Sequence, residues 1–134
     1  MYERCKTFVK SAPPVRAIYS LDREMPVEIP ELLPGTLYLL ILRTLKSSAL
    51  HGYAIAKRIK ETSGDSLIVE EGSLYPALNR MLVKGWVTAE WGISENNRKA
   101  RFYKLTPLGA AQLKQQLRQF ENVVRAISMV IQTA

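Results

Sequence analysis

The spacing of apolar residues predicts three helices in the first two thirds of the chain. The first is expected to begin at Pro34, because proline suits a first helical turn, and to run to about Lys46. This helix is apolar on nearly every side, which in a small domain indicates that a partner subunit covers part of it. The second is expected over residues 51–63. The third is expected from Ser73, a good N-cap, to the helix stop at Gly85.

Short apolar runs between and after these helices predict β-strands. Residues 67–69 form one candidate strand. Residues 86–91 and 101–105 form two more, and the turn-rich residues 92–100 lie between them. Two such runs around a turn predict a β-hairpin, here with a polar and basic tip.

The last helix is expected to open at Thr106, an N-cap followed by proline, and to continue to the end of the chain. Its apolar residues are separated alternately by three and four positions, which is the a/d seam of a coiled coil. The seam consists of Ala110, Leu113, Leu117, Phe120, Val124, Ile127 and Ile131. A seam of this length suffices to dock on another helix or on its symmetry mate, so residues 106–134 are predicted to be a dimerisation helix.

Composition bounds the class of protein. The chain has 134 residues, of which 47% are hydrophobic and 23% charged, enough for one domain with a real core. Lys and Arg number 19 against 12 acidic residues, and the net charge of +7 suits a polyanion such as nucleic acid or an anionic membrane surface. The single cysteine excludes an internal disulfide and favours a reducing compartment. The longest apolar run, residues 37–42, is too short to span a bilayer, so a soluble cytoplasmic protein without a membrane partner is expected.

The order of the elements predicts the fold class: mainly α with a small β-hairpin (α+β). We expect a winged helix-turn-helix over residues 32–105, followed by the long C-terminal helix. In such a fold the second and third helices read DNA and the hairpin forms the wing. The predicted DNA-binding residues are Ser73, Tyr75, Asn79 and Arg80 on the third helix, and Arg98, Lys99 and Arg101 on the wing.

The chemistry of these residue types supports double-stranded DNA as the partner. Asn79 could pair bidentately with adenine, and Arg80 with guanine or a phosphate. The basic residues of the wing suit the DNA backbone or the minor groove. The alternative for both sets is an ordinary solvated surface.

The first residues of the chain differ from the rest. Residues 1 to about 31 hold four of the seven prolines and show no sustained period, which predicts a flexible arm. Met25 is followed by Pro-Val-Glu-Ile-Pro-Glu, which leads straight into the first helical pattern. Residues 1–24 are therefore either an extension upstream of the natural start at Met25 or a basic arm that helps to hold DNA.

No arrangement of residues points to catalysis, a metal or a cofactor. His51 is the only histidine and is interpreted as a helix-start residue, since the distant Cys5 cannot complete a metal site with it. No Ser-His-Asp set, phosphate loop or supported carboxylate pair occurs, so the chain is not expected to be an enzyme. The alternative to a DNA-binding regulator is a protein-interaction adaptor that uses the last helix as its working surface.

Several motifs, in this order and spacing, carry a family resemblance. They are Leu33-Pro-Gly-Thr-Leu-Tyr-Leu-Leu-Ile-Leu, Leu50-His-Gly-Tyr-Ala-Ile, Glu71-Gly-Ser-Leu-Tyr-Pro-Ala-Leu-Asn-Arg-Met, Lys84-Gly-Trp-Val and Arg98-Lys-Ala-Arg-Phe-Tyr-Lys-Leu-Thr-Pro-Leu-Gly. With them the chain resembles the PadR family of bacterial transcriptional regulators, and its single last helix resembles the subgroup with a short C-terminal helix. The long N-terminal segment departs from the family's compact start.

The resemblance implies a homodimeric repressor that binds a palindromic operator, with the C-terminal helix packed against the partner subunit, often on its first helix. A small-molecule effector is possible in such a protein, but no residue here identifies one. The residues predicted at the dimer interface come from the first and last helices. They are Leu37, Leu40, Ile41, Leu113, Leu117, Phe120, Val124, Ile127 and Ile131.

Overall fold

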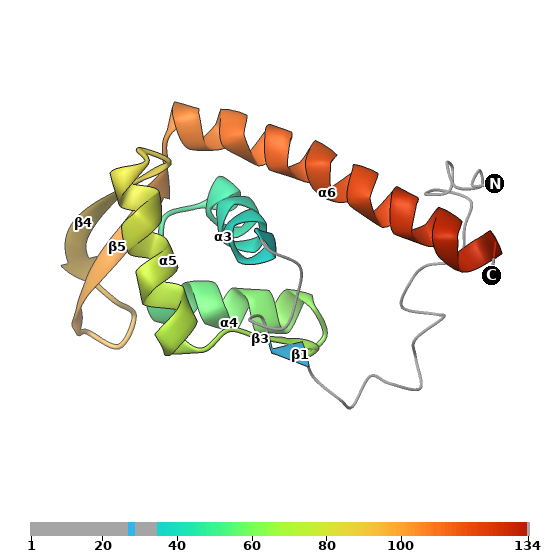
Figure 1. The fold of residues 1–134 in the computed structure, drawn as a ribbon. Helices are drawn as coiled ribbons and strands as arrows, with labels where there is room; N and C mark the ends of the chain where they lie inside the picture. Colours follow the sequence, from blue (N-terminus) through green and yellow to red (C-terminus); the bar gives the residue numbers. More distant parts are fainter. Residues whose placement is uncertain (1–26, 29–34, 134) are drawn as a thin grey trace. The chain divides into compact units, whose positions relative to one another are not determined.

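The computed structural model describes residues 27–28 and 35–133 (Figure 1). The chain divides into two compact units. One comprises residues 26–116, and the described part of the other is residues 117–133, the outer part of the last helix. The elements, in chain order, are β1 (Val27–Glu28), α3 (Thr36–Ser47), β2 (Leu50–His51), α4 (Gly52–Thr62), β3 (Leu67–Ile68), α5 (Glu71–Val83), β4 (Val87–Ile93), β5 (Lys99–Leu105) and α6 (Pro107–Thr133).

The strands form two small sheets. The larger one is antiparallel in the order β2-β5-β4, and its β4–β5 hairpin is paired from Val87 with Leu105 to Ile93 with Lys99. The two residues of β2 pair with the other edge of β5. β1 and β3 form a parallel pair of two residues each. Together with the helices this is the α+β winged helix predicted from the sequence.

The core of the first unit lies among α3, α4, α5 and the sheet. In Figure 1 these three helices gather on one side of the β4–β5 hairpin. The predicted inward residues of α4 are correct, since Ile55 and Ile59 are buried and Ala56 is half-buried. Six large side chains are fully enclosed: Ile41, Leu42, Ile55, Leu74, Leu78 and Met81.

Local signals correctly predicted several helix ends. Thr106 caps α6, because its Oγ1 accepts a hydrogen bond of 2.9 Å from the N–H of Gly109. α5 ends before Gly85, which has a φ of 79°. There the N–H of Trp86 bonds to the carbonyl of Met81 at 3.0 Å and the N–H of Gly85 to that of Leu82 at 3.1 Å, which is a Schellman motif.

Two predicted helix starts were wrong. α3 begins at Thr36, because Gly35 has a φ of 85° that a helix does not continue through, and Pro34 lies outside the described residues. α5 begins at Glu71 with Glu70 as its N-cap residue. The carbonyl of Glu70 already accepts the N–H groups of Ser73 and Leu74, at 3.0 and 2.9 Å. Ser73 therefore lies inside the first turn and is not the cap.

The strand predictions need smaller corrections. The wing strands reach two residues further toward the tip than expected, to Ile93 and from Lys99, so Lys99 belongs to β5 rather than to the turn. The strand predicted over residues 67–69 covers Leu67–Ile68, and β2 was not predicted at all. The arm predicted for residues 1–31 lies outside the described residues except for Val27–Glu28, which form β1.

The close approach of α6 to the sheet generates a stability prediction. A Cβ added to Gly109 would overlap the carbonyl oxygen of Trp86, which also accepts hydrogen bonds from the N–H and Oγ1 of Thr106. We expect Gly109→Ala to lower the free energy of unfolding by about 1–3 kcal/mol, because the backbone must shift. Thermal unfolding followed by circular dichroism measures the change.

Gly72→Ala is the matched control, since it lies in α5 and a Cβ there would meet no atom within 4 Å. It should leave stability unchanged or raise it slightly, because alanine favours a helix more than glycine does. Equal melting temperatures for the Gly109 variant and the wild type would contradict this account of how α6 begins.

Candidate nucleic-acid interface

A groove of about 680 Å³ lies between α5, the start of α4 and the wing. Five of the seven predicted DNA-binding residues line it, although they come from separate parts of the sequence: Tyr75, Asn79, Arg98, Lys99 and Arg101. Sequence reasoning did not place several other polar and aromatic lining residues there: His51, Tyr53, Trp91, Ser94 and Asn96.

The helical face of the groove is set by the spacing of α5. Tyr75 and Asn79 lie four positions apart, so both point to the same side, while Leu74 and Leu78 are buried on an adjacent face. Burial first, and then the charge of Glu71, raises the pKa of Tyr75 above its ordinary value. The phenol therefore stays protonated at neutral pH and can donate a hydrogen bond.

A glycine at the start of α4 makes room for this tyrosine. A Cβ added to Gly52 would lie 2.5 Å from the hydroxyl oxygen of Tyr75 and 2.7 Å from its ring. The Tyr75 ring therefore packs directly against the backbone of Gly52. This contact gives a physical reason for the glycine that follows His51.

The other two predicted residues of α5 do not line the groove. The Nε of Arg80 donates a hydrogen bond to the hydroxyl of Tyr38 on α3, and its guanidinium lies 5.7 Å from the centre of that ring. Successive side chains on a helix point about 100° apart, so Arg80 faces α3 whereas Asn79 faces the wing. Ser73 is half-buried in the first turn.

The wing supplies positive charge from the opposite wall. Lys99 and Arg101 are exposed and lie two positions apart on β5, hence on the same face of the strand. The Nζ of Lys99 lies 5.2 Å from the ring centre of Trp91, which is 66% exposed. Within residues 35–133, no carboxylate forms an ion pair with Arg98, Lys99 or Arg101. None of the described carboxylates therefore competes with a polyanion for these charges.

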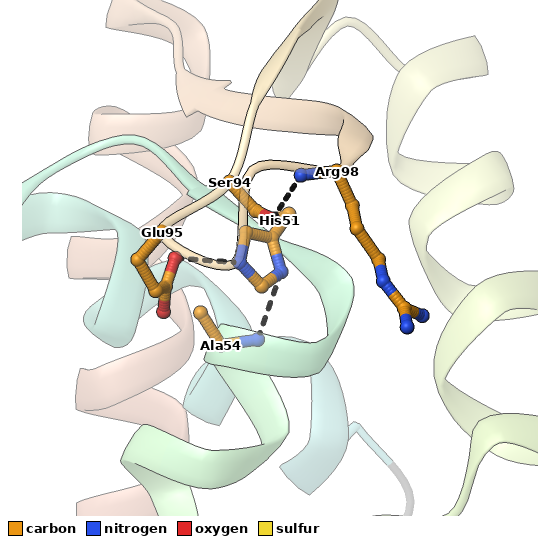
Figure 2. Close-up of polar contacts among 5 residues, drawn as sticks. All are labelled: His51, Ala54, Ser94, Glu95 and Arg98. Carbon is orange, nitrogen blue, oxygen red and sulfur yellow. Dashed lines mark hydrogen bonds and ion pairs between the residues drawn. The ribbon is translucent and has the colours of Figure 1, made fainter.

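Hydrogen bonds between its own residues close the wing tip. The N–H of Ser94 bonds to the carbonyl of Arg98 at 2.8 Å, and the N–H of Arg98 bonds back to the Ser94 Oγ at 3.3 Å (Figure 2). Asn97 has a φ of 60°, a conformation that asparagine tolerates better than most residues do. The tip is therefore a defined turn that presents Arg98.

His51 links this tip to the helices. Its Nδ1 accepts the N–H of Ala54 at 3.2 Å and caps α4, which confirms the helix-start prediction. Its Nε2 lies 3.3 Å from the Oε1 of Glu95 on the tip (Figure 2). A backbone hydrogen bond, and after it the bond from His51, hold the pKa of Glu95 below its usual value. Residue type and spacing gave no signal for this contact.

The predicted dimer-interface residues fall into three groups. Ile41 is 0% and Leu113 5% exposed, so both belong to the core of the first unit. Leu37 and Leu40 are half-buried on α3. On the outer part of α6, taken by itself, Val124 is half-buried and the remaining predicted residues are exposed: Leu117, Phe120, Ile127 and Ile131. Further apolar residues of this part are also exposed: Val123, Met129 and Val130.

None of the helices that the structure describes is both long and apolar enough to cross a membrane. Within the same residues, His, Cys, Asp and Glu side chains form no group of three that could hold a metal ion.

Comparison with known proteins agrees with this geometry. A transcriptional regulator from Clostridium thermocellum is 26% identical, with a TM-score of 0.65 over 70% of this chain and 91% of its own. A PadR family transcription regulator from Clostridium difficile is 25% identical, with a TM-score of 0.62 over 72% of this chain and 99% of its own.

Bacillus subtilis PadR, solved in complex with operator DNA, is 27% identical, with a TM-score of 0.56 over 64% of this chain and 48% of its own. The model of the transcriptional regulator PadR-like family matches residues 41–115, more than half of the sequence. The chain therefore belongs to the transcriptional regulator PadR-like family.

Proposed function

We propose that this chain binds double-stranded DNA sequence-specifically, as a homodimeric repressor at a palindromic operator. The observation that carries the proposal is the groove in which Tyr75 and Asn79 of α5 face Arg98, Lys99 and Arg101 of the wing. The complex of Bacillus subtilis PadR with operator DNA supports it, because that protein shares the fold and family.

The chemistry of the two walls suits the two parts of a duplex. α5 enters the major groove in this proposal, and the amide of Asn79 pairs with an adenine edge. The basic residues of the wing lie on the adjacent DNA backbone or in the minor groove, where positive charge favours binding to any DNA sequence. Arg80 and Ser73 lie outside the groove, so no base contact is assigned to them.

The outer part of α6 supports the homodimer. Leu117 is 42%, Ile127 43% and Ile131 65% exposed, and they follow the a/d spacing of a seam. A second copy of α6 would cover this apolar surface. In the first unit, Leu37 and Leu40 are partly exposed on α3, and a partner subunit could cover them too. A two-fold dimer presents two copies of α5, which is why a palindromic operator is expected.

Two substitutions in the groove separate affinity from sequence preference. We expect Arg98→Ala to weaken binding to the promoter of the chain's own gene and to a shuffled duplex alike. It should also reduce the salt dependence by about one phosphate contact per subunit. Asn79→Ala should lower affinity for the promoter by about 1–3 kcal/mol and narrow the gap between the two duplexes. Fluorescence anisotropy titrations over a range of salt concentrations measure both effects.

Lys60→Ala is the control, because Lys60 is an exposed base that does not line the groove. It removes the same charge but should leave the preference for the promoter intact. Wild-type binding that is insensitive to salt, or a selection from random duplexes that recovers no preferred sequence, would favour the protein-interaction adaptor instead.

The repressor role has its own measurement. In transcription with purified polymerase, wild-type protein should lower the yield of transcript from that promoter, because a bound operator blocks the polymerase. Asn79→Ala should need a higher protein concentration for the same effect. An increase in transcript would make the protein an activator.

The seam on α6 generates a prediction about assembly. Leu117→Lys or Phe120→Lys places a charge within an apolar surface and should convert dimers into monomers in sedimentation velocity. Gln119→Lys adds the same charge at an exposed polar position on α6 and should leave the dimer intact. Dimers that persist in both seam variants would show that the seam packs within one chain.

A further inference from the structure

One acidic residue occupies an unfavourable place on the wing. Glu95 lies at the tip, three residues before Arg98, and its side chain is 71% exposed. A carboxylate beside a phosphate backbone is repelled, so in a wing that binds DNA this residue lowers affinity through its charge alone. Its contact with His51 therefore calls for a physical reason.

The hydrogen bonds of His51 fix which atom meets Glu95. Because Nδ1 accepts the N–H of Ala54, the neutral ring carries its proton on Nε2. That proton points to the Oε1 of Glu95, at 3.3 Å between heavy atoms. His51 is only 8% exposed and meets the ring of Phe102 edge-on, with the ring centres 5.3 Å apart. The histidine is thus held from three sides and offers Glu95 a fixed partner.

Among the described residues, strand pairing joins the wing to the start of α4 only at some distance from the tip. β2 pairs with β5 only at Tyr103 and Phe102. From Phe102 to Arg98 the chain runs four residues, about 13 Å, and in the described structure the part of β5 in this stretch pairs only with β4. A two-stranded ribbon of this kind twists and bends easily. The contact between Glu95 and His51 joins the wing tip to the residue that caps α4.

We propose that the contact between His51 and Glu95 positions the wing tip relative to α4 and α5, so that Arg98 and Asn79 meet the duplex together. This inference rests on the proposed function and deepens it. Glu95 and His51 act here as positioning residues, because neither needs to touch DNA. Figure 2 shows the Arg98 side chain extending away from the contact between His51 and Glu95, in which it takes no part.

The sign of one substitution tests the proposal. Glu95→Ala removes an acid from a DNA-binding surface, so charge alone predicts equal or tighter binding to the promoter duplex. Loss of positioning predicts binding about three- to tenfold weaker, the range expected for one lost hydrogen bond. Glu95→Gln keeps an oxygen acceptor and loses the charge, so it should bind at least as tightly as wild type. Glu90→Ala, an exposed acid on β4 outside the groove, is the matched control.

The partner residue provides a double-mutant cycle. His51→Asn keeps a good N-cap for α4 but is too short to reach Glu95. It should weaken promoter binding by the same three- to tenfold, and adding Glu95→Ala should weaken it no further. Additive losses, or an alanine variant that binds as tightly as wild type, would overturn the proposal.

A measurement without DNA keeps the inference separate from the proposed function. In the free protein, amide hydrogen exchange at Asn97 and Arg98 should be severalfold faster in Glu95→Ala than in Glu90→Ala, because the tip moves more. Equal rates of amide exchange in the two variants would show that the contact between His51 and Glu95 does not hold the tip, whatever the binding data show. Wild-type protein that binds neither duplex would instead refute the proposed function. The amide exchange rates would then still decide whether the contact between His51 and Glu95 holds the tip.

Discussion

The pairing of β2 with β5 is the constraint on which the rest of the first unit depends. Only two residues, Leu50 and His51, form β2, and they pair with Tyr103 and Phe102. The next residue begins α4, so this pairing fixes the start of that helix against the wing. α5 packs in turn on α4 and on β4. Backbone hydrogen bonds therefore fix the start of α4 against the base of the wing, where the groove begins.

What the sequence predicted well depends on contacts between near neighbours. The cap at Thr106 and the stop at Gly85 each satisfy backbone groups within five residues, so residue type and spacing are sufficient to identify them. The hairpin was predictable for the same reason. The expected fold predicts that Asn79 and the basic residues of the wing share one surface. In the structure Asn79, Arg98, Lys99 and Arg101 line the same groove.

The features that sequence reasoning missed depend on distant partners. β2 is two residues long and carries no period, so it exists only because β5 is there to pair with it. Ser73 has the side chain of a typical N-cap, but the carbonyl of Glu70 accepts the first hydrogen bonds of the helix, so the helix begins before Ser73. Arg80 binds Tyr38, which lies 42 residues earlier. The apolar character of the whole first helix likewise suggested an interface at Ile41, although the unit's own core encloses it.

A fixed groove matters more for selectivity than for affinity in the proposed complex. The attraction between Arg98 and a phosphate falls off over a Debye length of about 8–10 Å, so it tolerates a wing that moves slightly. A bidentate bond from Asn79 to adenine tolerates only a few tenths of an ångström, since hydrogen bonds weaken steeply with distance and angle. A loose wing would still hold DNA, but it would allow α5 to shift against the bases. In the proposed complex, the pairing of Leu50 and His51 with β5 therefore holds α5 in the position that base reading would need.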